Sequence, residues 1–349
     1  MIKIFFDVQE EYYLPQYTPI AEALLSRGVD LSFVCYGANS SANIPDCYTA
    51  IEVQDSKEAL KLYNVKKPNY IFLGNTFQGI ELLNHKIKTA LVSHGIGPKA
   101  CYYEISDCEP SVRFVEGPYR TERLQSIYPE QTFIDVGYAK LDPVVNGELS
   151  NITPVKYGLD PRKKSILYAP TFFPSSIENM SDSFPEDFSE YNILLKPHYF
   201  SMASEKYQKQ RDKLKLWDKA DNVYLAKSNE INLLPFMAVA DVLISDASSA
   251  LFEFAALDKP IVWCDFYKLR WSYRGLLSFR FKNRMDEDLY KYADIAVHAK
   301  GYKSLKKLVE SQVMFPGELS DIRMRYTEDL AGKVDGQVSK RIADYIMSN

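Results

Sequence analysis

The chain has 349 residues, of which 46% are hydrophobic and 25% charged, a composition that excludes a disordered or fibrous protein. At about 150 residues per domain, this length predicts two domains. The formal net charge of -4 argues against a general nucleic-acid-binding protein, which would carry a broadly basic surface. The five cysteines include no C-x-x-C pair, so neither a zinc site nor a disulfide framework is indicated, and a reducing cytosol fits them best.

The N-terminal stretch becomes acidic too soon to be the apolar core of a signal peptide. No apolar run reaches the roughly 18 residues that a membrane-spanning helix needs. We therefore expect a cytoplasmic protein, with peripheral attachment to the inner face of the cell membrane as the alternative.

The first part of the chain alternates between short β-rich runs and amphipathic stretches. The runs with strand character are residues 2–6, 31–35, 70–73, 89–92 and 133–136. Strands that alternate with helices predict a parallel sheet covered by helices on both faces. We interpret residues 1–150 as one Rossmann-like domain.

A linker rich in glycine and proline is predicted over residues 144–162, and after it the alternation starts again. The second set of strand-like runs is residues 165–168, 192–195, 223–225, 242–244 and 261–264. Residues 151–349 are therefore predicted to form a second Rossmann-like domain that ends in helices. The fold class is α/β, with two doubly wound domains facing a cleft, and ligands are expected beyond the carboxyl ends of the strands.

The segment 240–254, ADVLISDASSALFEF, changes from strand to helix periodicity at a group of polar residues. Asp246, Ser248 and Ser249 lie in the predicted turn, where unpaired backbone N–H groups at a helix start can hold a phosphate. The alternative is that one of these side chains only caps the helix. Glu253 lies one helical turn beyond Ser249, where its carboxylate would accept hydrogen bonds from ribose hydroxyls.

Two more predicted strands end in polar residues. The strand over 192–195 runs into Lys196 and His198, two groups that suit a diphosphate, although a lone histidine is as often structural. The strand over 165–168 opens into a loop with Thr171, which we predict to contact the base or phosphate of a nucleotide.

His94 follows the strand over 89–92. Histidine side chains ordinarily have a pKa near neutral pH, which suits a general base that takes a proton from a hydroxyl group. The alternative is a hydrogen-bonded histidine beneath a loop. His94 and His198 each follow a predicted strand, one in each domain, so we expect them to face each other across the cleft. His85 and His298 lie in polar stretches that we interpret as helical and exposed.

Two charged segments complete the set of candidates. Asp286 and Asp288 form a D-x-D pattern, but they follow no strand, so we interpret them as a solvated helix start and predict no metal site. The segment 268–284 carries basic and aromatic residues and no acid. Arg270 and Arg274 within it would bind an anionic acceptor or a membrane surface, with a solvated loop as the alternative.

These motifs together resemble the CDP-glycerol glycerophosphotransferase family of cell-wall and capsule polymer enzymes, over roughly residues 90 to 275. The resemblance rests on His94-Gly95 with Lys99, on residues 137–142 (GYAKLD), 168–171 (YAPT) and 196–198 (KPH), and above all on 240–249 continuing to 257–261.

The resemblance implies a GT-B fold in which the C-terminal domain holds CDP-glycerol and the N-terminal domain binds the acceptor, without a metal or other cofactor. His94 would be the base that activates the acceptor hydroxyl, and Lys99 an acceptor contact. His198, Ser248 and Ser249 would stabilise the diphosphate as CMP leaves, and Glu253 matches a position that is usually acidic.

The sequence departs from the family's pattern at three positions. The family commonly has tyrosine in place of Ala247, a basic residue in place of Phe173, and proline in place of Tyr199. These departures leave the donor open between CDP-glycerol and another cytidine-activated group.

The sequence therefore predicts a transferase that moves glycerol phosphate from CDP-glycerol to a hydroxyl of a glycan or polyol-phosphate acceptor and releases CMP. In one form of this prediction, the acceptor is linked to a lipid. One alternative is a metal-independent GT-B glycosyltransferase of the sialyl or Kdo type, which uses a CMP-sugar. Another is a UDP-sugar 2-epimerase, which needs several carboxylates for proton abstraction. A third is a nucleotide-sensing protein that binds the donor without turning it over.

Overall fold

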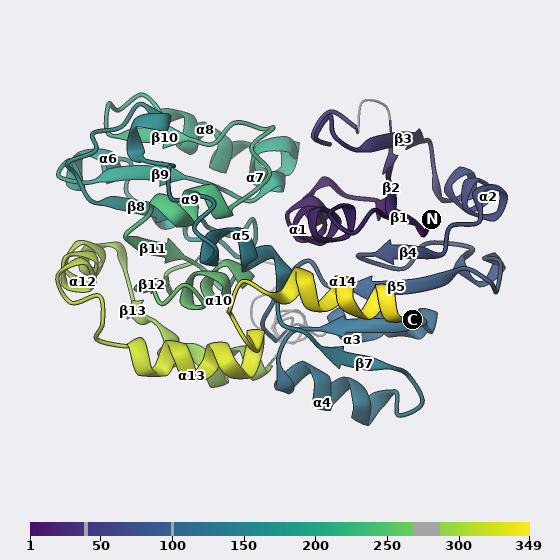
Figure 1. The fold of residues 1–349 in the computed structure, drawn as a ribbon. Helices are drawn as coiled ribbons and strands as arrows, with labels where there is room; N and C mark the ends of the chain where they lie inside the picture. The colour runs from purple at the N-terminus through teal and green to yellow at the C-terminus, as the bar shows by residue number, and fades with distance from the viewer. Residues whose placement is uncertain (38–40, 99–100, 268–286) are drawn as a thin grey trace, which may run out of the picture. The chain divides into compact units, whose positions relative to one another are not determined.

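The computed structural model describes residues 1–37, 41–98, 101–267 and 287–349, and the chain divides into two compact α/β units. The first unit contains residues 1–146 together with 328–349, and the second contains residues 147–327. Each unit is built on one parallel sheet with helices between its strands, as the alternating sequence pattern predicts (Figure 1).

The first unit contains a seven-stranded sheet in the order β3-β2-β1-β4-β5-β6-β7, in which every neighbouring pair is parallel. The strands are β1 (Lys3–Val8), β2 (Asp30–Tyr36), β3 (Thr49–Val53), β4 (Tyr70–Leu73), β5 (Lys88–Val92), β6 (Val112–Val115) and β7 (Phe133–Asp135). The helices are α1 (Leu14–Leu25), α2 (Ser56–Lys66), α3 (Cys101–Glu104), α4 (Pro118–Ile127), α5 (Asp142–Val145) and α14 (Val338–Ser348).

Aromatic side chains link the central strands of this sheet. The Phe6 ring on β1 stacks on Phe33 of β2 at 5.0 Å and on Phe72 of β4 at 4.8 Å between ring centroids. All three side chains are fully buried. A parallel sheet is covered on both faces, which is why its central strands read as continuous apolar runs.

The C-terminal helix α14 belongs to the first unit, where it packs against α1 (Figure 1). Val338, Ile342 and Ile346 recur every four residues and are each 1% exposed, so they form one apolar face of the helix. Tyr345 also contacts Phe114 of β6, at 5.4 Å between ring centroids. From the sequence, residues 151–349 are all predicted to belong to the second domain; the structure corrects that boundary, because the apolar face of α14 is buried in the first unit.

The second unit contains a six-stranded parallel sheet in the order β10-β9-β8-β11-β12-β13. Its strands are β8 (Ser165–Tyr168), β9 (Asn192–Leu195), β10 (Val223–Leu225), β11 (Val242–Ser245), β12 (Ile261–Cys264) and β13 (Val297–Ala299). Its helices are α6 (Phe184–Asp187), α7 (Tyr199–Ala203), α8 (Gln208–Trp217), α9 (Leu234–Val239), α10 (Ser249–Ala255), α12 (Tyr302–Met314) and α13 (Ser320–Ala331), the last of which runs across the boundary into the first unit.

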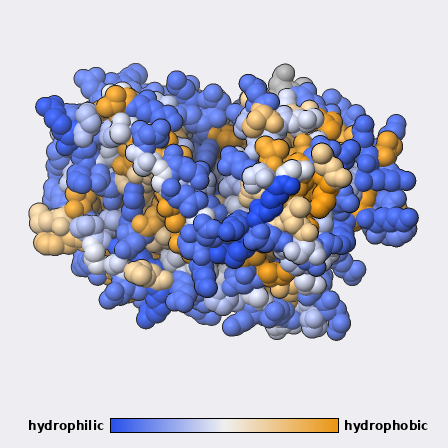
Figure 2. Space-filling model, in the orientation of Figure 1, coloured by the Kyte–Doolittle hydropathy of each residue, from blue (hydrophilic) through white to orange (hydrophobic). Residues whose placement is uncertain are grey.

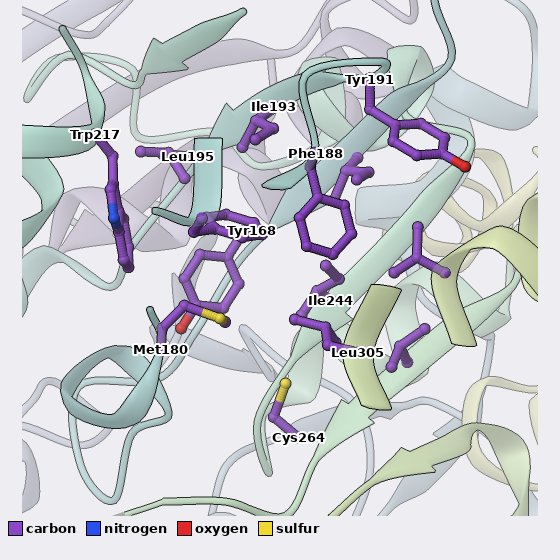
Figure 3. Close-up of a cluster of buried hydrophobic side chains, with 14 of the residues drawn as sticks. Tyr168, Met180, Phe188, Tyr191, Ile193, Leu195, Trp217, Ile244, Cys264 and Leu305 are labelled. Atoms are coloured by element: carbon purple, nitrogen blue, oxygen red, sulfur yellow. The ribbon is translucent and has the colours of Figure 1, made fainter. Parts of the chain in front are cut away.

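The core of the second unit forms on one side of this sheet (Figure 3). Tyr168, Ile244 and Cys264 come from three neighbouring strands, and the Trp217 ring from α8 packs beside Tyr168 at 6.2 Å. Residues 174–187 contain the short helices η6 (Ile177–Asn179) and α6. Their side chains complete the core, so this segment is part of the packed structure.

The strand β13 changes the interpretation of His298, which the sequence analysis placed in an exposed helical stretch. His298 lies on this strand, and its ring stacks on Trp263 at 5.3 Å. Its Nδ1 atom lies 3.1 Å from a carboxylate oxygen of Asp265, and its Nε2 atom 2.8 Å from the Ala293 carbonyl oxygen. His298 is therefore a half-buried structural residue. His85, by contrast, is exposed as expected, in a turn and not in a helix.

The face of the molecule shown in Figure 2 is mainly hydrophilic, with hydrophobic residues scattered between polar ones. Among the residues that the structure describes, no helix is both long enough and apolar enough to cross a membrane.

Candidate functional site

His94 lies at the carboxyl edge of the first sheet, in the segment that leaves β5, and is half-buried. Three tyrosine rings surround its imidazole, with centroid distances of 4.9 Å for Tyr12, 5.1 Å for Tyr13 and 5.3 Å for Tyr102. The Tyr13 ring is stacked on the imidazole, whereas the other two approach by their edges. The imidazole is therefore held in an aromatic environment at the end of a rigid strand.

The Tyr13 ring is fixed by its own surroundings. It is 1% exposed, and burial raises the pKa of its hydroxyl well above the usual value, so the hydroxyl stays protonated at neutral pH. Gly74, just after β4, lies against this ring, and a Cβ atom at this position would come within 2.7 Å of the Tyr13 Cδ2 atom. Only glycine leaves room for the ring that stacks on His94.

The backbone of the His94 segment is held by side chains from two other elements of the same unit. The Tyr138 hydroxyl donates to the His94 carbonyl oxygen at 2.8 Å. The Arg120 guanidinium, on α4, donates to the carbonyl oxygens of Gly95 and Gly97 at 3.3 and 2.7 Å. These bonds fix the path of the chain at His94 and directly after it.

In the second unit, three neighbouring strands end together, as the sequence analysis predicted for the stretches after β8, β9 and β11. Their extensions are joined by hydrogen bonds: the backbone N–H groups of Lys196 and His198 donate to the Tyr168 and Pro170 carbonyl oxygens at 3.0 and 3.3 Å. The Ser245 hydroxyl donates to the Ala169 carbonyl oxygen at 2.6 Å. The segments with Thr171, with Lys196 and His198, and with Ser248 therefore lie at one edge of this sheet.

His198 is exposed at the start of α7, where its Nδ1 atom accepts a hydrogen bond from the Phe200 backbone N–H at 3.2 Å. Because Nδ1 is the acceptor, the proton of a neutral imidazole lies on Nε2, which becomes the donor. The Phe172 ring packs on the imidazole at 4.6 Å and the Phe200 ring at 5.3 Å. His198 thus has both a structural role as a cap and an Nε2–H group suited to a phosphate oxygen.

The turn between β11 and α10 shows that Ser248 caps the helix, since its hydroxyl oxygen accepts from the Ala250 backbone N–H at 3.3 Å. This is the capping role that the sequence left open as the alternative. Ser249 is the first residue of α10, and its side chain is half-buried. The two serines are therefore not equivalent.

The structure changes the interpretation of Asp246, which the sequence analysis placed among the donor-binding residues. Its side chain is fully buried, and its carboxylate accepts from the Ser175 hydroxyl and the Ser176 backbone N–H, each at 3.2 Å. Burial raises the pKa of Asp246 to about 7, against the opposing effect of these hydrogen bonds. Asp246 points inward and anchors the loop that follows Thr171.

The remaining candidates differ in their exposure. Thr171 and Lys196 are half-buried at the sheet edge. Glu253 is only 2% exposed on α10, so its carboxylate is not presented at the surface where a ribose contact was expected. The candidate acceptor residues Lys99, Arg270 and Arg274 lie outside the described residues, as does Asp286.

Several residues that surround the two histidines were not singled out from the sequence. Tyr13 and Tyr102 are separated from His94 in the chain, and no local pattern connects them to it. Glu116 and Arg120 carried a weaker signal, because opposite charges four residues apart meet at the start of a helix. The strand β6 that precedes them has no continuous apolar run in the sequence, because Arg113 interrupts it.

The chemistry available at the two edges is different. The first unit presents an imidazole among aromatic rings, which suits proton transfer from a hydroxyl group. The second presents a lysine, an imidazole N–H and a serine hydroxyl, which suit an anionic group. Within the described ranges, no group of three or more His, Cys, Asp or Glu side chains is arranged to hold a metal ion.

Comparison with curated proteins identifies relatives in wall polymer synthesis. The chain is 33% identical over 150 residues to the teichoic acid glycerol-phosphate primase of Bacillus spizizenii, which corresponds to 41% of the chain and 38% of that protein. It is 30% identical over 164 residues to the teichoic acid poly(glycerol phosphate) polymerase of the same organism, or 42% of the chain and 38% of that protein. The matched segments thus span well under half the length of these relatives.

The fold is shared with a solved wall teichoic acid polymerase, TagF, at a TM-score of 0.70 and 18% identity over 99% of this chain and 88% of the other. It is also shared with the UDP-GlcNAc 2-epimerase of Neisseria meningitidis, at a TM-score of 0.63 and 12% identity over the full length of both chains. These likenesses confirm the α/β fold class of two doubly wound units.

The family model of CDP-glycerol:poly(glycerophosphate) glycerophosphotransferases matches residues 53–279. This range is well over half of the 349 residues, and it contains both His94 and the strand ends of the second unit. The family resemblance read from the short motifs is thereby confirmed. The chain belongs to the CDP-glycerol:poly(glycerophosphate) glycerophosphotransferase family.

Proposed function

We propose that this protein is a glycerophosphotransferase of wall or capsule polymer synthesis. It transfers glycerol phosphate from CDP-glycerol to a hydroxyl group of a glycan or polyol-phosphate acceptor and releases CMP. The observation that carries the proposal is the family match over residues 53–279, because it spans His94 together with Lys196, His198 and Ser249. The primase and polymerase relatives, which are named for glycerol-phosphate chemistry, support the same reaction class.

The proposed reaction is a displacement at phosphorus. The acceptor oxygen attacks the phosphorus atom that carries glycerol, and the bond from this phosphorus to the bridging oxygen breaks, so the bridging oxygen leaves with CMP. His94 takes the proton from the acceptor hydroxyl and later releases it to water. Because phosphoryl transfer is promoted mainly by positioning and electrostatics, the tyrosine rings around His94 support this role by fixing the imidazole.

The second unit would bind the donor and stabilise the leaving group. Negative charge grows on the phosphate of CMP as the bond breaks, and preorganised donors that point at this charge lower the barrier. The Lys196 ammonium, the His198 Nε2–H and the Ser249 hydroxyl are our candidates, with Thr171 as a further contact to the nucleotide. Asp246 and Glu253 are left out of this set because both side chains are buried.

The acceptor side of the proposal rests on the sequence. Lys99, Arg270 and Arg274 remain the predicted contacts of an anionic acceptor. A lipid-linked acceptor and peripheral attachment to the inner face of the membrane belong to the same prediction. Binding of the protein to vesicles with and without anionic lipid would test the attachment.

The donor is the least constrained part of the proposal, since Phe173 stands where the family commonly has a basic residue and is only 4% exposed. The protein should be incubated in parallel with CDP-glycerol, another CDP-polyol, a CMP-sugar and UDP-GlcNAc, each with a polyol-phosphate acceptor. We expect CMP release and a product heavier by one glycerol-phosphate unit with CDP-glycerol, measured by chromatography and mass spectrometry. Turnover of a CMP-sugar alone would replace our proposal with a glycosyltransferase.

A 2-epimerase is the second candidate, because the solved epimerase has the same fold. Such a reaction needs several accessible carboxylates, and the two acidic candidates at the second sheet edge, Asp246 and Glu253, are both buried. We therefore expect no conversion in the UDP-GlcNAc arm. Donor binding without release of CMP in any arm would instead indicate a nucleotide-sensing protein.

A further inference from the structure

Two arginines of the first unit are buried next to the His94 segment: Arg113 on β6 is 0% exposed and Arg120 on α4 is 2% exposed. Arginine side chains are almost never fully buried unless they are paired. Arg113 donates to the Ser106 hydroxyl at 2.5 Å and to the Tyr102 carbonyl oxygen at 2.7 Å. Burial lowers the pKa of Arg113 to about 9, so it remains charged at neutral pH. It fixes the segment that carries the Tyr102 ring.

Arg120 contacts the surroundings of His94 in two ways. Its two terminal nitrogens donate to the carbonyl oxygens of Gly95 and Gly97, directly after His94. The same guanidinium lies over the Tyr102 ring at 4.6 Å, and this ring in turn meets the imidazole edge-on at 5.3 Å. One side chain thus determines both the backbone beside His94 and one wall of its aromatic environment.

Arg120 is itself held by an ion pair with Glu116, four residues earlier, and both side chains are buried. Removing two charges from water costs more free energy than a typical ion pair returns, so a buried pair is weak evidence for a stabilising role. Glu116 stands at the end of β6, directly beside β5, which leads into His94. The pair therefore ties the guanidinium to the same sheet that carries the imidazole.

Arginine suits this position because of its shape. Its planar guanidinium has five N–H donors in a fixed arrangement, so it can satisfy two carbonyl oxygens and one carboxylate at once. A lysine ammonium has the same charge, but it cannot span these three acceptors in one plane. The demand at this position is therefore geometric as well as electrostatic.

We propose that Arg120, oriented by Glu116, is a positioning residue that holds the His94 imidazole in the orientation needed to take the proton from the acceptor hydroxyl. This inference rests on the proposed function for the identity of the reaction. Arg120 acts through His94 and touches no reacting atom.

The first test compares Arg120→Met with Arg123→Met. Arg123 lies one turn further along α4, with its guanidinium over the Tyr103 ring at 4.5 Å, so its replacement also removes an arginine and an aromatic contact. We expect Arg120→Met to lower kcat by about 10- to 100-fold, as for a small misplacement of a reacting group, with the affinity for CDP-glycerol unchanged by calorimetry. Arg123→Met should keep the wild-type kcat.

A double-mutant cycle separates positioning from a general structural effect. In a His94→Ala background, Arg120→Met should lower the residual kcat no further, because residues that act through one group are not additive. A second loss of the same size in that background would show that Arg120 acts independently of His94, and would overturn the inference. If Arg120→Met does not fold, Arg120→Lys is tested in the same two backgrounds. We then expect a loss of kcat smaller than about 10- to 100-fold with His94 present, and no further loss in the His94→Ala background.

A readout without turnover keeps the inference distinct from the proposed function. The chain has four histidines, so their imidazole Cε1–H signals can be followed by NMR and the His94 signal assigned with His94→Gln. We expect Arg120→Met to shift the His94 signal and Arg123→Met to leave it in place, even if CDP-glycerol proves to be the wrong donor. An unshifted His94 signal in a folded Arg120→Met protein would refute the positioning role whatever the reaction is.

Discussion

His94 is half-buried among three tyrosine rings of the first unit. Its proposed role as a base can therefore be tested separately from donor binding. We expect His94→Gln to lower kcat by about 10²- to 10⁴-fold, the usual contribution of a general base. Its affinity for CDP-glycerol should stay near the wild-type value in calorimetry, because the proposed donor contacts belong to the second unit. The matched control is His85→Gln, at an exposed histidine. Wild-type kcat in the His94 variant would return His94 to a structural role.

The buried carboxyl of Asp246 makes folding stability depend on pH. Its pKa is raised by burial to about 7 in the folded protein, against about 3.9 in an unfolded chain, so the folded state binds the proton more tightly. The protonated carboxyl contributes to the free energy of unfolding, and this contribution is fully present below about pH 4 and is lost as the pH rises to about 7. Between these values the free energy of unfolding should fall by at most about 1.4 kcal/mol per pH unit.

Asp246→Asn should remove this dependence, which urea denaturation at pH 5, 6, 7 and 8 would measure. The stability of the variant relative to wild type should therefore rise with pH up to about 7 and level off above it. Asp321→Asn, at an exposed aspartate, serves as the control and should follow the wild-type curve. Parallel curves for Asp246→Asn and wild type would contradict a raised pKa.

Individual residues were only partly predictable from the sequence. The position of His94 and His198 after strands follows from local pattern, and the structure places both at sheet edges. The inward orientation of Asp246 does not, because it depends on Ser175 and Ser176, about seventy residues earlier in the chain. Only the folded sheet brings β8 and β11 together and creates that contact.

At the scale of elements, the start of α10 allows the two serines to be separated. Ser248 caps the helix, so Ser248→Ala should lower the free energy of unfolding by about 0.5–2 kcal/mol, measured by urea denaturation. Ser249→Ala should change stability little, since Ser249 is not the cap, but it should weaken CDP-glycerol binding in calorimetry. Equal donor affinity in Ser249→Ala and wild type would place the diphosphate elsewhere.

Ten of the strands were recognisable because they are short apolar runs. The other described strands, β3, β6 and β13, show which features make a strand hard to recognise from the sequence. β6 contains Arg113, whose charge interrupts the run although the side chain is buried. β13 has only three residues, one of them His298. β3 lies at the edge of its sheet and is largely exposed, so it has no continuous apolar sequence.

At the scale of the whole molecule, α14 connects the end of the described chain to the first unit. Ile342 is 1% exposed on its apolar face, so Ile342→Ala should lower the free energy of unfolding by about 2–4 kcal/mol. Hydrogen exchange should show the loss of protection in residues 1–146 and not in 147–327. Met347→Ala, at a residue 41% exposed on the same helix, is the control and should change little. Deprotection confined to the second unit would contradict this assignment.

The sequence predicted two units divided at residue 150, because the linker has its own composition, and the structure divides the chain after residue 146. It did not predict that the last residues return to the first unit. The apolar spacing of Val338, Ile342 and Ile346 shows that α14 must bury a face, but that spacing does not say against which sheet. Only the contact with α1 decides it.

The return of residues 328–349 to the first unit also affects the order in which the two units can fold during synthesis. Gly117, next to Glu116, has a φ of +79°, and a Cβ atom there would collide with the Asp329 carbonyl oxygen, so the late segment crosses directly over the start of α4. Domains generally fold in the order of synthesis, N-terminal first. Here the ribosome synthesises all of the second unit before residues 328–349, which complete the first. While the second unit can already fold, the first unit lacks α14, and the surface that α14 covers is still exposed.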